Sequence, residues 1–438
     1  MSTQRTWRRP VGVGATILLG VSLVACSGSQ TPTESTDDAS GKITVWSWST
    51  NAAEIADLFM EEHPDIEVEL INPGDGPTTQ ERTATAFQAG TGAPDVVMIE
   101  HDDVFENAAQ GYIVPLTDFG IDEIADDFAP SLISQLTYDG EVYGTPIDGS
   151  PMALFYRADL FEQAGIEPPA TWDEFATAAE TLKTALPDSF IANTPFAEGG
   201  IPRMFWQTGS GPFTIDGENI AVDYDSEAYT EVVDYWLDLH ERGLTADLPI
   251  WSPEWNAGFA DGTMAAWIGP GWAPVILGSS AESSAGAWAV ATLPSWDADA
   301  PASPEWGGSS YTVTEQSENK AAAAEYVKWV NHDPAAYELL FELTGSFPVL
   351  NEYLNDEEFL STPFEFFGDQ PVNQVLAEAM KVVPTDWQWT PFNSEVNRVT
   401  DEELQSLLEG TISSQEALVN IQDRLREYAS SQGFTVED

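Results

Sequence analysis

The sequence predicts an α/β protein built from two domains that share one ligand. Three strand patterns alternate with two helical patterns between Lys42 and Ile99, which indicates parallel strands joined by helices. About 400 residues follow Lys42, rich in tryptophan and phenylalanine and without a second low-complexity linker. A chain of that length is sufficient for two lobes, each with its own hydrophobic core.

Apolar periodicity defines the first elements. Ile43 and Val45 alternate with polar residues, which is typical of a half-buried strand, and apolar residues at helical spacing follow until the His-Pro pair at 63–64. The expected elements are, in order, a strand at 42–47, a helix containing 55–59, a strand at 66–70, a helix at 83–89 and a buried strand at 92–99 that ends at the acidic run 100–103.

Capping signals place several later helices. Thr171 with Glu174 forms a capping-box pattern, in which a hydroxyl accepts the N3 amide and the glutamate reaches back. Gly243 ends a predicted helix near 226–242 as a C′ glycine. The remaining predictions are a strand at 141–148 leading into 152–156, and capping boxes at Thr400 with Glu403 and at Ser413 with Glu416.

The first 25 residues have the organisation of an export signal. Arginines precede an apolar run of about 14 residues, too short to cross a hydrocarbon core roughly 30 Å thick, and Ala25 stands directly before Cys26. The order Leu-Val-Ala-Cys at 23–26 resembles the bacterial lipobox, which implies removal of residues 1–25 and diacylation of Cys26. The alternative is a secreted protein whose cysteine is incidental.

Composition excludes several classes of protein. Residues 26–41 lack large apolar side chains, so they are expected to form a disordered tether. The chain has 15 Lys+Arg against 73 Asp+Glu, and loss of the three signal arginines would leave 12 against 73, a net charge of −61. Such a surface repels nucleic acid. With Cys26 as the only cysteine, no disulfide or thiolate metal site is possible.

No sequence pattern indicates catalysis. The chain lacks a Gly-x-Ser-x-Gly elbow, a phosphate-binding Gly-x4-Gly-Lys-Ser/Thr loop and a dinucleotide fingerprint. Its four histidines are dispersed, without metal-ligand spacing. We therefore predict neither an enzyme nor a bound metal or cofactor. Carboxylate pairs of the kind used by glycoside hydrolases are too abundant here to be informative.

Tryptophan is unusually frequent in this sequence. The sixteen tryptophans are about three times the usual number, and many follow predicted strands or flank glycine turns. Loops at the carboxyl ends of strands hold the ligands of open α/β sheets, and indole faces stack on sugar rings while carboxylates and amides bond hydroxyls. This pattern favours a neutral sugar. The competing interpretation is core packing, expected above all for Trp172, Trp236 and Trp329.

Seven segments in a fixed order resemble the family 1 extracellular solute-binding proteins, the ABC-importer components related to maltose-binding protein. The most distinctive are Phe-Tyr-Arg-Ala-Asp-Leu-Phe-Glu-Gln-Ala-Gly-Ile at 155–166 and Phe-Ala-Asp-Gly-Thr-Met-Ala-Ala-Trp-Ile-Gly-Pro-Gly-Trp at 259–272. The others begin at Ile43, Gly92, Gly111, Tyr143 and Ala322. The resemblance covers nearly all of 42–430.

The resemblance implies a type II periplasmic-binding-protein-like fold. Each lobe would be a mostly parallel sheet flanked by helices, with a ligand cleft between the lobes and three chain crossings. We expect an N-terminal lobe at 42–148 plus 307–353 and a C-terminal lobe at 149–306 plus 354–438. Ligand would close the lobes by a hinge motion.

The same resemblance assigns ligand-binding positions in both lobes. Asp102 would accept sugar hydroxyls, and Trp272 would be a stacking platform. The full set is Trp48, Ser49 and Asn51 in the first-strand loop, Glu100 and Asp102 after the 92–99 strand, Asp148 and Ser150 at the hinge, and Phe196, Glu198, Trp272, Trp387, Trp389 and Asn393 in the second lobe. An extra glycine in Gly-Pro-Gly-Trp at 269–272 and Ile99 in place of an aromatic depart from maltose-binding protein, so maltose itself is not implied.

The sequence thus predicts a monomeric, lipid-anchored receptor outside the cytoplasm that delivers a sugar, an oligosaccharide above all, to ABC permease subunits. The alternatives are a secreted carbohydrate-active hydrolase and a receptor for a polyol, a polyamine or a glycerol phosphodiester. A phosphodiester would need arginines, for which Arg203 and Arg398 are the candidates.

Overall fold

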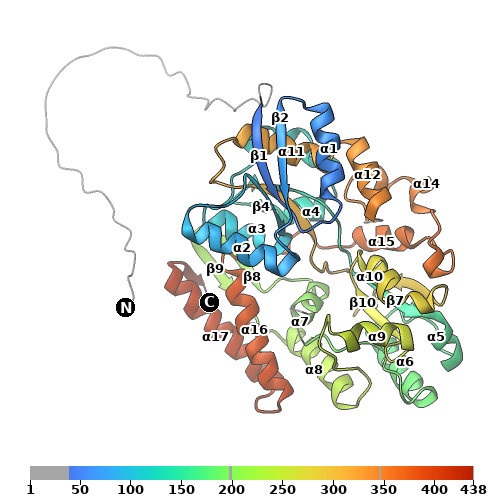
Figure 1. Ribbon diagram of the computed structural model, residues 1–438. Coiled ribbons are helices and arrows are strands. Elements are labelled where there is room, and N and C mark those ends of the chain that lie inside the picture. The colour runs from blue at the N-terminus through green and yellow to red at the C-terminus, as the bar shows by residue number, and fades with distance from the viewer. Residues whose placement is uncertain (1–38, 197–199, 345–346, 438) are drawn as a thin grey trace, which may run out of the picture. The chain divides into compact units, whose positions relative to one another are not determined.

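Figure 1 shows the computed structural model of the chain, which describes residues 39–196, 200–344 and 347–437. The predicted signal at 1–25, Cys26 and most of the predicted tether at 26–41 lie outside the described residues, as does Glu198.

A five-stranded sheet contains the first predicted strands. Its order is β2 (Ile66–Ile71), β1 (Gly41–Trp46), β3 (Val96–Glu100), β12 (Ser309–Val313) and β6 (Gly144–Pro146). β1 pairs in parallel with β2 and with β3, which confirms the predicted arrangement of these three strands. β12 arrives from far along the chain and runs antiparallel between β3 and β6.

Both faces of this sheet are buried. Along β3, Val96 and Met98 pack in one hydrophobic core, while Val97 and Ile99 pack in a second core on the opposite face. The first core is covered by α1 (Ala52–Glu62), α11 (Lys320–Val330) and α12 (Pro334–Thr344), and the second by α2 (Gly76–Ala89) and α3 (His101–Ala109). Polar groups that follow β3 therefore emerge at the edge of a rigid, fully buried strand.

A second sheet has a different strand direction from the one expected. β7 (Ala153–Arg157) lies between β10 (Ala266–Gly269) and β11 (Trp288–Thr292) and is antiparallel to both. The expectation of a mostly parallel sheet in each lobe is wrong here. β10 and β11 run in the same direction and are joined through α10 (Ala273–Ser280). β7 inserts between them from a distant part of the chain, so no single crossover helix sets the direction of β7 relative to its neighbours.

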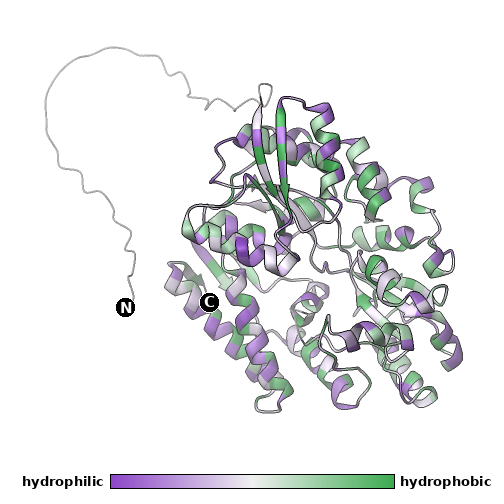
Figure 2. Cartoon of the chain, viewed as in Figure 1, coloured by the Kyte–Doolittle hydropathy of each residue, from purple (hydrophilic) through white to green (hydrophobic). Residues whose placement is uncertain are grey.

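The largest hydrophobic core surrounds this second sheet. Trp236 is 0% exposed and meets Trp172 edge-on at 5.3 Å, as their helical spacing predicted, whereas Trp329 is half-buried against the first core. The helices of the large core include α5 (Ala158–Ala164), α6 (Trp172–Ala185), α8 (Glu227–Glu241), α9 (Pro253–Asp261) and α15 (Val372–Met380). Figure 2 shows these helices with mixed hydrophobic and hydrophilic faces, as expected for helices packed on a core.

A third, small sheet lies near the C-terminus. It contains β8 (Phe213–Asp216), β9 (Asn219–Val222) and β13 (Thr435–Glu437), and it contacts α17 (Ser414–Gln432), which packs on α16 (Asn393–Leu408). The remaining α-helices and strands are α4 (Pro130–Gln135), α7 (Gly200–Met204), α13 (Asn351–Leu354), α14 (Glu357–Leu360), β4 (Thr137–Tyr138) and β5 (Glu141–Val142).

Two of the three predicted capping patterns begin helices. Thr171 accepts from the Glu174 amide at 3.2 Å, and Ser413 forms a complete capping box with Glu416. Thr400 instead lies inside α16, because apolar residues at helical spacing continue upstream of it to Val396. The predicted helix start at Thr400 is therefore wrong.

Two chain segments run side by side between the first and second sheets. The Ile147 amide donates to Ser309 O (2.7 Å), Trp306 to Ser150 O (3.1 Å) and Met152 to Pro304 O (2.9 Å). These segments connect β6 with β7 and β11 with β12. The predicted lobe boundaries at 148/149 and 306/307 fall within them, and the division of the chain into lobes stays a prediction.

Candidate ligand-binding cavity

A cavity of about 1080 Å³ is lined by residues from distant parts of the chain. α2, the end of β3 and α3 contribute one part of the lining, and α7, α10, α16 and the segment 306–309 contribute another, together with the loop residues Trp48, Asp148 and Trp251. The volume is slightly above the range of about 300–1,000 Å³ that is usual for small-molecule sites. Because the lining comes from the carboxyl end of β3, this is where an open α/β sheet places a ligand.

One side of the cavity is aromatic. Trp272 lies between Trp251, at a ring-centroid distance of 5.9 Å with an interplanar angle of 27°, and Trp306, at 6.0 Å with 63°. The Trp272 indole N–H donates to Trp306 O at 3.2 Å, which fixes the orientation of the ring. The Arg203 guanidinium carbon lies 5.0 Å from the centre of the Trp306 ring. We call these three tryptophans the tryptophan wall.

The other side carries half-buried carboxyl groups. Glu100 is the last residue of β3, and Asp102 and Asp103 stand in the first turn of α3, so one strand-to-helix junction presents three acidic groups. Gln80 of α2 donates to Asp103 at 3.3 Å. Asp148 joins them from the segment after β6, where its carboxylate accepts the Ser309 amide at 2.7 Å.

Burial changes the protonation of these groups. It raises the pKa of Glu100 to about 7, with a further increase from the charge on Asp102, and it raises the pKa of Asp148 to about 6. Burial also raises the pKa of Asp102, and the charge on Arg203 partly opposes the increase at both Glu100 and Asp102. Carboxyl groups in this range accept hydrogen bonds when ionised and donate one when protonated, so they suit a ligand rich in hydroxyl groups.

His101 has a structural role beneath the acidic side. Burial lowers its pKa to about 4, so the imidazole is neutral, and its Nε2 lies 2.9 Å from Ser309 O, to which it donates. The His101 amide donates to Gly308 O at 2.9 Å. These bonds attach the start of α3 to the glycine pair at 307–308, whose φ angles of 70° and 105° favour glycine.

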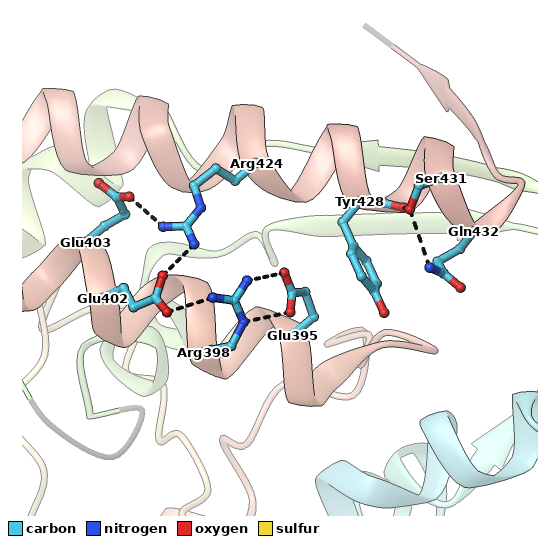
Figure 3. A network of polar contacts seen from close by, with 8 residues as sticks. All are labelled: Glu395, Arg398, Glu402, Glu403, Arg424, Tyr428, Ser431 and Gln432. Carbon is cyan, nitrogen blue, oxygen red and sulfur yellow. Dashed lines mark hydrogen bonds and ion pairs between the residues drawn. The ribbon is translucent and has the colours of Figure 1, made fainter. Parts of the chain in front are cut away.

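α16 closes one end of the cavity. The Glu106 carboxylate of α3 accepts both the amide and the hydroxyl of Ser394 at 2.9 Å, at the N-terminus of α16. Figure 3 shows how α16 is fixed to α17: Arg398 pairs with Glu395 and Glu402, and Arg424 pairs with Glu402 and Glu403. Arg398 is engaged in this network and does not line the cavity.

The structure brings five of the predicted site residues together. They line the cavity from both sides: Trp48, Glu100, Asp102, Asp148 and Trp272.

The other described candidates lie outside the cavity lining. Trp387 stacks on Trp206 at 4.5 Å, Phe196 is buried in the large core, and Trp389 donates to the Gln135 side chain at 3.3 Å. Ser150 is fully buried and its carbonyl accepts the Trp306 amide, whereas Ser49 and Asn51 are partly exposed in the loop after β1. Asn393 is buried one residue before Ser394, which does line the cavity.

Several lining residues were not among the predicted site residues. Trp306 had a usable signal, since it precedes a Gly-Gly pair, and Arg203 was considered only for phosphodiesters. Trp251, Glu106 and Ser394 carry no local motif. They reach the cavity only through the packing of distant segments.

The free energy of unfolding is expected to depend on pH because of a buried glutamate near the cavity. Glu305 is 3% exposed, accepts hydrogen bonds from the Gln135 side chain and the Ser150 amide, and burial raises its pKa to about 7. The unfolded value lies near 4.5. Between pH 4.5 and pH 7, Glu305 is protonated in the folded state and ionised in the unfolded state. The free energy of unfolding therefore rises as the pH falls through this range, by up to about 1.4 kcal/mol per pH unit.

Urea unfolding at pH 5 and pH 7.5 measures this contribution. Glu305→Gln is expected to reduce the stability gained on acidification, because glutamine stays neutral at both pH values. Glu218→Gln, at an exposed glutamate, is the matched control. Equal pH dependence in the wild type and Glu305→Gln would contradict the prediction.

Within the described ranges, no helix combines the length and apolar character needed to span a membrane. In that same part of the chain, no three His, Cys, Asp or Glu side chains are grouped to hold a metal ion.

A family model described as bacterial extracellular solute-binding protein matches residues 54–364. The chain belongs to this family. Membership places this solute-binding protein outside the cytoplasm, in a family that binds solutes. The two-lobed α/β fold class is confirmed by solved structures that cover about nine-tenths of the chain.

Several relatives carry the names of sugar-binding proteins. The solute-binding protein is 26% identical to the lactose-binding protein of Rhizobium radiobacter, over 86% of this chain and 90% of that protein. It is 26% identical to an arabinooligosaccharide-binding protein of Halalkalibacterium halodurans, over 76% and 78% of the two chains. A solved ABC transporter associated binding protein from B. animalis subsp. lactis Bl-04, in complex with beta-1,6-galactobiose, is 30% identical with a TM-score of 0.79, over 91% of this chain and all of that chain.

Proposed function

We propose that this solute-binding protein captures a carbohydrate, preferably an oligosaccharide, and delivers it unchanged to the permease of an ABC importer. The observation that carries the proposal is a tryptophan wall facing half-buried carboxyl groups in one cavity. Indoles cover the apolar faces of sugar rings, and carboxylates in the same cavity bond the hydroxyl edges. The sugar-binding names of its relatives support the same conclusion.

In this proposal, the residues have distinct roles. Trp272 stacks on a ring, while Glu100, Asp102 and Asp148 accept or donate hydrogen bonds to hydroxyl groups. Trp48 contributes a second aromatic surface from the opposite side. The lobes proposed at 42–148 plus 307–353 and at 149–306 plus 354–438 would close around the ligand, because only the closed state contacts it from both sides.

A thermal-shift screen tests the function. The panel contains glucose, galactose, lactose, maltotriose, beta-1,6-galactobiose, polyols and polyamines. A ligand at 100 times its dissociation constant stabilises the protein by about 2.7 kcal/mol. We expect an oligosaccharide to raise the melting temperature and to be recovered intact after long incubation. Cleavage of the sugar would favour the hydrolase alternative.

A polyamine receptor is the second candidate. Eight carboxyl groups and a single basic residue, Arg203, stand among the described residues that line the cavity. The resulting negative potential attracts cations. A response to polyamines alone would support this candidate and remove the sugar proposal.

Membrane attachment is a separate proposal. We infer from the sequence order at 23–26 that Cys26 is diacylated and anchors the protein to the outer face of the cell membrane. Incorporation of a labelled fatty acid into the wild type, and its loss in Cys26→Ser, tests this attachment.

A further inference from the structure

Trp251 has an unusual backbone conformation. It lies between α8 and α9 with a φ of 65°, in the left-handed region that favours glycine. Two other non-glycine residues in the described ranges have positive φ, Asp139 and Asp369, and aspartate tolerates this region. A bulky residue in this conformation is a strained position, and such positions cluster at binding sites.

The surroundings of Trp251 enforce this conformation. The Ser252 amide donates to Pro249 O at 3.1 Å, and the Ser252 hydroxyl accepts the Trp255 amide at 3.1 Å at the start of α9. The Trp251 ring also packs on the buried ring of Trp255 at a centroid distance of 5.2 Å. A turn on one side and a helix cap on the other therefore hold the residue in place.

The Trp251 side chain is turned toward the cavity. It is 46% exposed, yet it lines the cavity and lies nearly parallel to Trp272. Glycine or asparagine would satisfy the backbone conformation of this turn, and a polar side chain would suit the exposure. The combination of strain, exposure and cavity lining points to contact with a ligand.

We propose that Trp251 is a specificity-determining residue that extends the stacking surface of Trp272 and selects ligands of two or more sugar rings over monosaccharides. This inference rests on the proposed carbohydrate function. Trp251 follows Trp272 at a centroid distance of 5.9 Å and an interplanar angle of 27°, while Trp306 stands on the other side of Trp272 at 6.0 Å and 63°. A single ring seated on Trp272 leaves Trp251 uncovered, whereas a second ring covers it and adds its own contact.

Calorimetric titration of four proteins tests the proposal. The probes are glucose, galactose, lactose, maltotriose and beta-1,6-galactobiose, and the proteins are the wild type, Trp251→Ala, Trp251→Gly and Trp296→Ala. Trp296 is the matched control, because it is 37% exposed but packs on Trp172 and Tyr235 away from the cavity lining. Both Trp251 variants are expected to lose about tenfold in oligosaccharide affinity and less than about threefold in monosaccharide affinity. Trp296→Ala is expected to change neither.

A second measurement separates strain from ligand contact. Glycine relieves the positive φ and alanine does not, so Trp251→Gly is expected to melt at a higher temperature than Trp251→Ala. An unchanged ratio of oligosaccharide to monosaccharide affinity in the Trp251 variants overturns the inference while leaving the proposed function intact. Failure of the wild type to bind any sugar in the panel overturns both.

Discussion

Replacement of Trp272 by alanine is expected to weaken sugar binding about 30-fold, the equivalent of about 2 kcal/mol. The residue is central in the tryptophan wall, with Trp251 on one side and Trp306 on the other. Its removal deletes the middle of the stacking surface and also frees Trp306 O from its hydrogen bond. Calorimetric titration with the best oligosaccharide from the thermal-shift screen measures the loss.

The fold should survive this substitution. α10 begins directly after Trp272, but no side-chain cap from the indole supports the helix, and a proline in its first turn fixes the start. Trp272→Phe is the matched control, because it keeps an aromatic face and loses only the N–H donor. We expect it to retain most of the affinity. Wild-type affinity in Trp272→Ala would show that stacking at this position does not hold the ligand.

Elements set by local signals were predictable from the sequence. Alternation in β1 and β2, helical spacing in α8 and the capping box of α17 each lie within a few neighbouring residues, and the structure has all of them. The antiparallel pairing of β7 with β10 and β11 depends on where β7 inserts from a distant part of the chain, which no local pattern encodes. Thr400 failed as a helix start because a capping pattern is equally compatible with a helix interior when apolar spacing continues upstream.

Some residues of the candidate site were also predictable from local sequence, and others were not. Glu100 ends β3, and Asp102 and Trp272 follow β3 and β10 within a few residues, so strand ends place all three at the cavity. The family resemblance assigned Trp387 to the ligand site, but its ring is stacked on Trp206 in the large core. Trp251 has no motif and reaches the cavity through a strained turn. Aromatic residues serve cores and sugar sites equally well, so composition alone does not separate them.

Substitution of Gly308 by alanine is expected to destabilise the protein by roughly 3 kcal/mol and to weaken sugar binding. Its φ of 105° is unfavourable for any side chain, and an added Cβ would lie 2.6 Å from His101 Nδ1. A shift of the imidazole is unfavourable, because the ring is buried and its Nε2 donates to Ser309 O. His101 stands between Glu100 and Asp102, so any shift of its backbone also displaces two cavity carboxyl groups.

Gly307→Ala provides the matched control at the neighbouring position. Gly307 has a φ of 70°, which alanine adopts at a cost of about 1 kcal/mol, and the nearest atom to an added Cβ is Trp272 Nε1 at 3.9 Å. Urea unfolding compares the stability of Gly307→Ala, which carries backbone strain alone, with that of Gly308→Ala, which carries backbone strain and the clash against His101. Equal stability of the two variants would mean that the His101 ring yields. The sugar affinity of Gly308→Ala is then measured. Movement of the His101 ring would displace the carboxyl groups on either side of it, so wild-type affinity in this variant would show that these carboxyl groups do not hold the ligand.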